Sequence, residues 1–213
     1  MKTALVAGST GLIGQQLLQL LLNSSRYDSV KALTRSALPI THPKLVPLIV
    51  DFSKLEESKA ELKADDVFCC LGTTMAKAKT KEKFRQVDYE YPLKLATISS
   101  ENKAKQFLLV SALGADKNAA VFYNRVKGEV EEAIKNIRFD AIHIFKPSLL
   151  LGPRAENRPA EDAAKFFYKF FGFLIPEKYK AIDAGKVAMA MLQFAAREEK
   201  GIFVHESKEL QHI

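Results

Sequence analysis

The chain has 213 residues, of which 47% are hydrophobic and 27% charged, with a formal net charge of +7. This is the composition of an ordinary globular protein with a substantial core, and the length suits one domain spanning residues 1–213. No run of about 18 uncharged apolar residues occurs, which argues against a transmembrane segment. The segment before the first glycine, Met1 to Ala7, is too short to be a signal peptide. We therefore expect a cytoplasmic protein.

The positive charge raises three hypotheses: binding of nucleic acid, of a membrane surface or of an anionic small molecule. Most lysines alternate with acidic residues, and stacking aromatic residues are not interleaved with the densest basic cluster. That cluster comprises Lys77, Lys79, Lys81 and Lys83. A solvated surface is favoured over nucleic-acid binding.

The two cysteines, Cys69 and Cys70, are adjacent in an apolar run. Neighbours on a strand point to opposite faces, so a disulfide between them is not expected. Two cysteines are also too few for a zinc site, and no metal is predicted. We expect both to be small buried side chains.

Short apolar runs alternate with longer helical patterns as far as about Lys146. The predicted strands are Thr3–Ala7, Val30–Leu33, Leu45–Val50, Val67–Leu71, Phe107–Ser111 and Ala141–Phe145. The predicted helices between them are Gly11–Asn23, Lys54–Glu61, Lys81–Ser100 and Tyr123–Asn136. Several strands are apolar throughout, as in sheets covered on both faces. The pattern predicts an α/β fold, a doubly wound and mainly parallel Rossmann-like sheet with helices on both faces.

The alternation of strand and helix patterns ends after Pro147. Residues that interrupt helices and strands, such as Gly152-Pro153, come first, and residues 163–173 then carry phenylalanines at helical spacing. That helix is predicted to pack on the main domain or on a second copy of the chain, with a protein partner or a membrane surface as alternatives. A last helix, Gly185–Arg197, and a strand, Ile202–His205, close the chain.

A glycine-rich turn lies between the first predicted strand and the first helix, where a dinucleotide-binding turn must lie. The turn consists of Gly8, Ser9, Thr10, Gly11, Leu12, Ile13 and Gly14. The first glycine permits the tight turn, the second lets the backbone approach a diphosphate, and the third allows close helix packing. The diphosphate would accept hydrogen bonds at the positive end of the helix.

The residues after the second strand indicate which dinucleotide binds. NAD enzymes usually carry an acidic residue there, whereas this chain has Arg35 between Thr34 and Ser36. A guanidinium suits a 2′-phosphate, so NADP(H) is the predicted cofactor.

Two later turns are predicted to line the cofactor. Asp51 and Phe52 follow the third strand, near the expected adenine edge. The turn after the fourth strand, near the ribose and nicotinamide, contains Leu71, Gly72, Thr73 and Thr74. Ordinary turn chemistry is the alternative explanation for both.

Tyr123 and Lys127 stand four residues apart on one face of a predicted helix, just after the fifth strand. A free phenol has a pKa near about 10, and a neighbouring cation lowers it. Tyr123 could then exchange a proton with a carbonyl or alcohol while hydride moves to or from a nicotinamide.

These features resemble the short-chain dehydrogenase/reductase superfamily in its atypical or extended branch. The glycine turn, the Tyr123/Lys127 pair and the segment Lys146–Arg154 carry the resemblance. The most similar group is that of the Tat-interacting-protein oxidoreductases, through the strings Phe68–Thr74, Gly114–Lys117 and Val126–Glu131.

The resemblance implies a Rossmann-like domain that binds NADPH, with Tyr123 and Lys127 as the catalytic pair. Pro147 belongs with the predicted cofactor-binding residues, and residues 147–185 are expected to contribute the substrate side. Several relatives act as regulators with poorly defined substrates.

The family usually places a serine after the fifth strand, where it hydrogen-bonds the substrate oxygen. Here that strand ends at Val110-Ser111-Ala112, so one commonly hydroxylated position is alanine. Ser111 is a candidate catalytic residue, or it caps a turn.

Two hypotheses follow. The first is an NADP-dependent oxidoreductase acting on a small carbonyl or alcohol. The second is a dinucleotide-sensing regulator that binds a protein partner without efficient turnover. His143, within the sixth strand, is expected to be a packed core residue in either case.

Overall fold

The computed structural model describes residues 1–152, 176 and 179–213. Its main sheet contains seven parallel strands in the order β3-β2-β1-β4-β5-β6-β9. The strands are β1 (Thr3–Ala7), β2 (Ser29–Thr34), β3 (Leu45–Ile49), β4 (Asp66–Cys69), β5 (Gln106–Val110), β6 (Ala141–Lys146) and β9 (Gly201–Glu206). A short parallel pair, β7 (Leu150–Leu151) with β8 (Ile182–Asp183), lies apart from this sheet.

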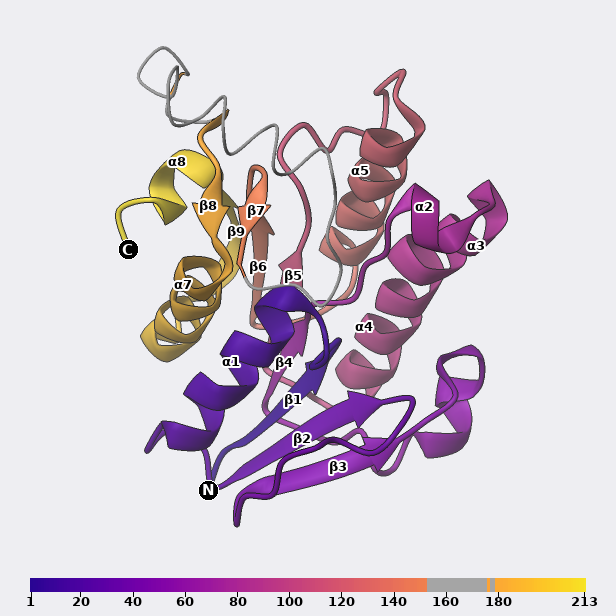
Figure 1. Cartoon of the computed structure of the whole chain (residues 1–213). Helices are drawn as coiled ribbons and strands as arrows, with labels where there is room; N and C mark the ends of the chain where they lie inside the picture. Colours follow the sequence, from indigo (N-terminus) through magenta and orange to yellow (C-terminus); the bar gives the residue numbers. More distant parts are fainter. Residues whose placement is uncertain (153–175, 177–178) are drawn as a thin grey trace.

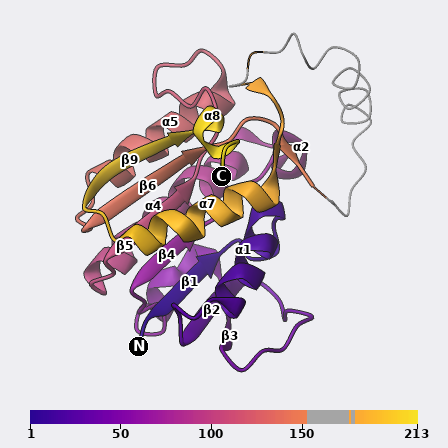
Figure 2. The same cartoon turned by 90° about the vertical axis from the view of Figure 1, so that its left-hand side faces the viewer.

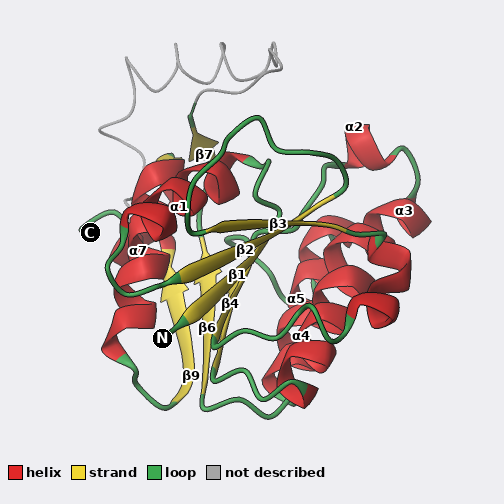
Figure 3. Ribbon diagram, turned by 90° about the horizontal axis from the view of Figure 1, so that it is seen from below, coloured by secondary structure: helices red, strands yellow, loops and turns green. Residues whose placement is uncertain are grey.

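Helices cover both faces of the sheet, as the alternating pattern predicts (Figure 3). On one face, α1 (Leu12–Asn23) packs beside α7 (Ala184–Arg197), and side chains such as Leu17 and Met191 share one core with the sheet. The other face carries α4 (Tyr91–Glu101) and α5 (Phe122–Lys135), whose Leu95 and Val130 form the second core. Figure 2 shows α7 running across its face of the sheet. The predicted α/β fold is confirmed.

The position of a strand in the sheet determines whether its apolar side chains are buried or exposed. The β4 strand lies centrally and is buried along its whole length. The β3 strand is equally apolar but lies at the edge, and there Val46 and Ile49 are exposed. Pro47 suits an edge strand, where a missing N–H costs little.

Two predicted helices differ from the structure. Residues 54–61 were expected to be α-helical, but Phe52–Ser58 form a 3₁₀-helix, η1, which Asp51 caps through the backbone N–H of Ser53. The predicted helix 81–100 divides into α3 (Lys81–Arg85), a π turn called η2 (Gln86–Glu90), and α4. The two short helices α2 (Met75–Ala78) and α8 (Ser207–Leu210) were not predicted.

The strand order places a ligand crevice at the carboxyl ends of the strands, between β1 and β4. The chain runs outward from β1 to β2 and β3, then crosses to β4 on the other side of β1. The turns after β1 and β4 therefore diverge, and ligands of doubly wound sheets bind at such a reversal. The start of α1, helix α2 and the start of α5 lie toward this edge (Figure 1). The predicted Phe-rich helix 163–173 lies outside the described residues.

Candidate functional site

The turn between β1 and α1 depends on glycine at two positions. Gly8 has φ +85°, and a Cβ there would lie 2.5 Å from the carbonyl oxygen of Cys70, at the end of β4. A Cβ on Gly14 would lie 2.1 Å from the Gly8 carbonyl oxygen. Both contacts are with backbone atoms, so neither can relax by a side-chain rotation. The glycines hold α1 against the turn, as the motif predicts.

The start of α1 is suited to an anion. Gly11 caps the helix without a side-chain hydrogen bond, and no acidic residue lies in the first turn of α1. The N-terminal amides and the helix dipole are therefore not neutralised by a nearby carboxylate of this helix. Ser9 is 2% exposed, and its Oγ has no hydrogen-bond partner among the described residues. A buried hydroxyl without a partner, next to a helix start, fits the diphosphate of a dinucleotide.

The turns after β2 and β3 bring together predicted and unpredicted residues. Arg35 is exposed just beyond β2. The ring of Phe52 lies 5.7 Å from that of Tyr91 at the start of α4. Burial raises the pKa of Tyr91, the Asp51 carboxylate raises it further, and Arg35 opposes both. Arg35 and Asp51 are thus both close enough to Tyr91 to affect its ionisation.

The turn after β4 borders the catalytic candidates. The backbone N–H of Thr73 donates to Oδ2 of Asp88 at 2.8 Å, and Thr74 caps α2 by accepting from the N–H of Lys77. A Cβ on Gly72 would lie 3.3 Å from Asp88 Oδ1 and 3.6 Å from Lys127 Nζ. The structure therefore places Gly72 directly against the Asp88–Lys127 pair.

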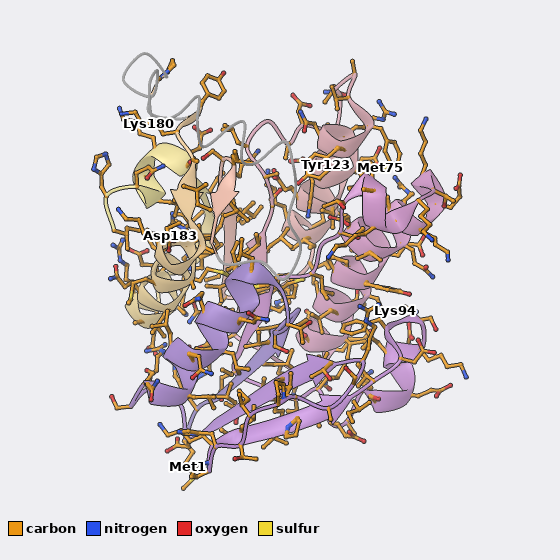
Figure 4. All side chains as sticks on the ribbon, in the orientation of Figure 1. Met1, Met75, Lys94, Tyr123, Lys180 and Asp183 are labelled. Atoms are coloured by element: carbon orange, nitrogen blue, oxygen red, sulfur yellow. The ribbon has the colours of Figure 1, made fainter. Side chains whose placement is uncertain are left out.

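Lys127 is buried and held as a cation. Its Nζ lies 2.8 Å from Oδ1 of Asp88, and the side chains are 6% and 0% exposed. Burial lowers the pKa of Lys127, but the Asp88 carboxylate and, to a smaller extent, Tyr123 raise it, and the net shift is upward. Tyr123 is half-buried, with its ring centroid 5.5 Å from that of Phe84. Figure 4 shows Tyr123 on α5, toward α2 and its Met75.

Ser111 lies in a separate buried cluster. Its hydroxyl donates to Oε1 of Glu131, which is on α5 one turn beyond Lys127. Oε2 of Glu131 accepts from Lys146 Nζ at 3.1 Å, and Lys146 also donates to the Ala115 carbonyl at 2.9 Å. The Ser111 proton is thus directed at a carboxylate in this structure.

Pro147 follows β6, and its carbonyl oxygen accepts from the backbone N–H of Leu113 at 2.9 Å. Leu12 and Gly152 lie together, because a Cβ on Gly152 would be 2.8 Å from Leu12 Cδ1. The chain beyond β6 therefore returns to the start of α1.

Sequence reasoning missed Asp88, Glu131 and Tyr91. Asp88 and Tyr91 lie inside a stretch that was predicted as one regular helix, whose polar residues are usually on the solvent side. The signal for Glu131 was available: it is four residues after Lys127, which is four after Tyr123, so all three lie on one face of α5.

Two kinds of site are not found in the described part of the chain. No group of three or more His, Cys, Asp or Glu side chains there could hold a metal ion. None of the helices in those residues is long and apolar enough to cross a membrane.

Comparison with known proteins gives consistent matches. A family model described as NAD(P)H-binding matches residues 8–161. The protein named HTATIP2 from Rattus norvegicus is 34% identical over 220 residues, covering 100% of this chain and 89% of that protein. The Candida albicans protein named "Protein FMP52, mitochondrial" is 33% identical over 207 residues, covering 92% of this chain and 88% of the relative.

Solved structures share the fold at lower identity. The oxidoreductase ylbE from Lactococcus lactis superimposes with a TM-score of 0.69 at 18% identity, covering 99% of this chain and 96% of that one. The Bordetella bronchiseptica enzyme WbmH, in complex with NAD+, has a TM-score of 0.74 at 16% identity, with coverages of 97% and 76%. At these identities the similarity shows the fold alone.

Proposed function

The chain belongs to the NAD(P)H-binding family, as an HTATIP2-like Rossmann protein, and we propose that it is an NADPH-dependent oxidoreductase of the short-chain dehydrogenase/reductase type. Its substrate is a small carbonyl compound or the corresponding alcohol. Tyr123 exchanges the proton, Lys127 stabilises the phenolate, and residues 147–185 contribute the substrate side.

The observation that carries the proposal is the Tyr123–Lys127 pair on α5, next to the turn after β4. Lys127 is buried, and its raised pKa keeps it a cation at neutral pH. A phenol with a pKa near about 10 becomes a better proton donor when a cation stabilises its phenolate. A protein that only sensed the cofactor would have no use for this pair.

When bound, NADPH supplies the hydride that reduces the carbonyl carbon. Tyr123 donates a hydrogen bond to the carbonyl oxygen and then transfers its proton to that oxygen. Lys127 stabilises the phenolate that remains until solvent returns a proton. In the opposite direction, the phenolate takes the proton from the alcohol.

Cofactor binding is assigned to the turns already described. The first turn of α1, with the hydroxyl of Ser9, holds the diphosphate, and Arg35 binds the 2′-phosphate that distinguishes NADPH from NADH. Phe52 and Tyr91 border the adenine. Gly72 and Thr73 lie near the nicotinamide ribose.

One observation favours a second candidate function. The Ser111 hydroxyl donates to Glu131, and the following residue is Ala112. A serine hydroxyl that is bonded to Glu131 is not directed at a substrate oxygen, which suits a regulator that binds NADPH and a protein partner with little turnover. The FMP52 relatives carry "mitochondrial" in their names, so the cytoplasmic location stays a prediction.

A panel of small aldehydes and ketones tests the proposal. We expect NADPH oxidation by the wild-type protein, a loss of about 100-fold or more in Tyr123→Phe, and unchanged NADPH binding measured by cofactor fluorescence. Tyr89→Phe is the matched control, because it also removes one phenol hydroxyl and the Tyr89 ring packs under the Arg85 guanidinium. Equal rates in wild type and Tyr123→Phe would exclude Tyr123 from catalysis. Tight NADPH binding without turnover of any compound would favour the regulator.

A further inference from the structure

The segment that follows the turn after β4 is strongly basic. Residues 75–85 carry a single carboxylate, Glu82, against the cations Lys77, Lys79, Lys81, Lys83 and Arg85. The segment forms the short helices α2 and α3, and the chain turns between them at Lys79, where φ is +66°. Cations that are crowded on one surface repel one another, and a bound anion relieves that repulsion.

Phe84 fixes this basic segment beside Tyr123. The Phe84 side chain is buried, and its ring centroid lies 5.7 Å from that of Phe122 and 5.5 Å from that of Tyr123. Figure 1 shows α2 and α3 next to the start of α5, and Figure 4 labels Met75 of α2 near Tyr123. The basic segment is therefore held against the helix that carries the residue proposed to transfer the proton.

Two cations from different elements share the ring of Phe122, the neighbour of Tyr123 in the chain. Lys81 Nζ lies 5.5 Å from the ring centroid, and the guanidinium carbon of Arg125 lies 5.9 Å from it. Arg125 also donates to the carbonyl oxygens of Ala119 and Ala120, at 2.9 Å and 3.2 Å. A partly exposed aromatic ring orients a cation but does not neutralise its charge.

The nearby carboxylates neutralise only part of this positive charge. Arg85 forms an ion pair with Glu129. The Glu82 carboxylate is directed at Thr80 and at its own backbone N–H. Among the described residues, no carboxylate lies within ion-pair distance of Lys81 or Arg125. These two cations therefore keep a charge that a bound anion can neutralise.

We propose that Lys81 and Arg125 bind an anionic group of the substrate, a carboxylate or a phosphate, so that the carbonyl compound reduced at Tyr123 carries a negative charge. The inference rests on the proposed function, because it defines the substrate class of the same site. A lysine binds such a group as a point charge, and an arginine adds paired hydrogen bonds. The other lysines of residues 75–85 raise the local concentration of anions.

Aromatic aldehydes with one framework and different charge test the preference. The test compares kcat/KM for para-formylbenzoate, para-formylphenyl phosphate and the uncharged methyl ester of the benzoate. We expect wild type to prefer an anion by about tenfold, the order that two partly exposed ion pairs supply together. Because the substituent also alters the carbonyl group, the change between variants is the decisive readout. A larger preference for one of the two anions identifies the group as carboxylate or phosphate.

The variants remove the charges one at a time. Lys81→Gln should reduce the preference to about threefold, and Lys81→Gln/Arg125→Gln should abolish it. Lys81→Arg keeps the charge and should keep the preference, and salt at about 0.5 M should weaken it in wild type. The control Lys63→Gln/Lys103→Gln removes two exposed cations at the amino ends of the strands and should leave the preference in place. An equal preference in wild type and the Lys81/Arg125 variant, or an equal loss in the control, would overturn the inference.

A second measurement needs no turnover. NMR titration of the protein with NADP+ follows the binding of para-formylbenzoate, and we expect about tenfold weaker binding in Lys81→Gln/Arg125→Gln but not in the control. If no aldehyde is reduced but this loss is found, the proposed function fails and the anion site stands. If the carboxylate binds wild type no more tightly than the variant, the anion site is excluded. Lys81→Gln alone, at an exposed position, decides in the same way if the double variant does not fold.

Discussion

The two halves of the candidate site depend on different kinds of interaction. The dinucleotide half is made of backbone: Gly8 and Gly14 allow chain segments to approach until no Cβ could fit between them. The catalytic half is made of buried charges on α5, where Lys127 pairs with Asp88 and Glu131 pairs with Lys146. The first half needs small residues at fixed positions, and the second needs opposite charges that come from distant parts of the chain.

This difference has an energetic consequence. A close backbone approach fails when any atom is added, because packed main chain cannot move aside. A buried ion pair fails when one partner is removed, because the other is left charged and unsolvated. The two halves should therefore respond to opposite kinds of substitution.

The largest effect is expected for Gly14→Ala. The added Cβ would lie 2.1 Å from the Gly8 carbonyl oxygen, so α1 must separate from the turn. We expect the free energy of unfolding to fall by about 4 kcal/mol and NADPH affinity to fall on the order of 100-fold. Denaturant unfolding and cofactor fluorescence measure the two. The exposed Gln16→Ala, on the same helix, should change neither, and tight NADPH binding by Gly14→Ala would contradict the backbone argument.

The next largest effect concerns the second buried ion pair of the catalytic half, Glu131 with Lys146. Glu131→Ala removes the acceptor of Ser111 and Lys146, and we expect a loss of about 3 kcal/mol in the free energy of unfolding. Its neighbour Glu132 pairs with Lys135 in a more exposed position, so Glu132→Ala should cost less than about 1 kcal/mol. Urea midpoints compare them, and equal losses would mean that burial adds nothing to these pairs.

How much of each half could be predicted from the sequence follows from the same contrast. The glycine turn is a local signal: its spacing, the preceding strand and the following helix lie within 23 residues, and the structure has all three. The strands were predicted from apolar runs, although the runs could not show that β3 lies at an edge. The α-helix predicted at residues 54–61 was wrong, because short helical stretches take either the 3₁₀ or the α form according to their contacts.

The charged half could be predicted only in part. Tyr123 and Lys127 share one helix, so their spacing was visible. Asp88 is 39 positions before Lys127, and only the π turn directs it inward. The π turn does not follow from local sequence. The spacing of Glu131 on α5 shows the face on which it lies but not its pairing with Ser111, because that pairing depends on which distant groups are buried together.

A buried histidine pair on β6 and β9, at the edge of the sheet opposite β3, can be compared with the Lys127–Asp88 pair. His143 Nδ1 lies 3.1 Å from His205 Nε2 between β6 and β9. Burial, with smaller contributions from His205 and Arg197, lowers the pKa of His143 to about 4. His143 is therefore neutral at neutral pH whereas Lys127 is charged, because no carboxylate offsets the burial of His143 as Asp88 offsets the burial of Lys127. The predicted core position of His143 is confirmed.

The expected pH dependence has a definite sign. Unfolded histidine binds a proton below pH about 6.5, whereas native His143 does so only near pH 4. Stability present above pH 6.5 is therefore lost as pH falls through this window, by up to about 3 kcal/mol, and no further below it. Urea unfolding at several pH values should show a smaller loss in His143→Phe than in wild type. The exposed His212→Gln should behave as wild type, and parallel curves for all three would disprove the assignment.

The smallest effect concerns Arg35, an exposed side chain that we propose binds the 2′-phosphate of the cofactor. Arg35 is exposed beyond β2, so its value depends on a phosphate being present. Arg35→Ala should weaken NADPH binding by about 2 kcal/mol, roughly 30-fold, and NADH binding by less than about threefold. The exposed Arg138→Ala, between α5 and β6, removes the same charge from the protein and should affect neither cofactor. Equal weakening of both cofactors by Arg35→Ala would mean that the guanidinium serves the shared part of the dinucleotide, and the preference for NADPH would then need another source.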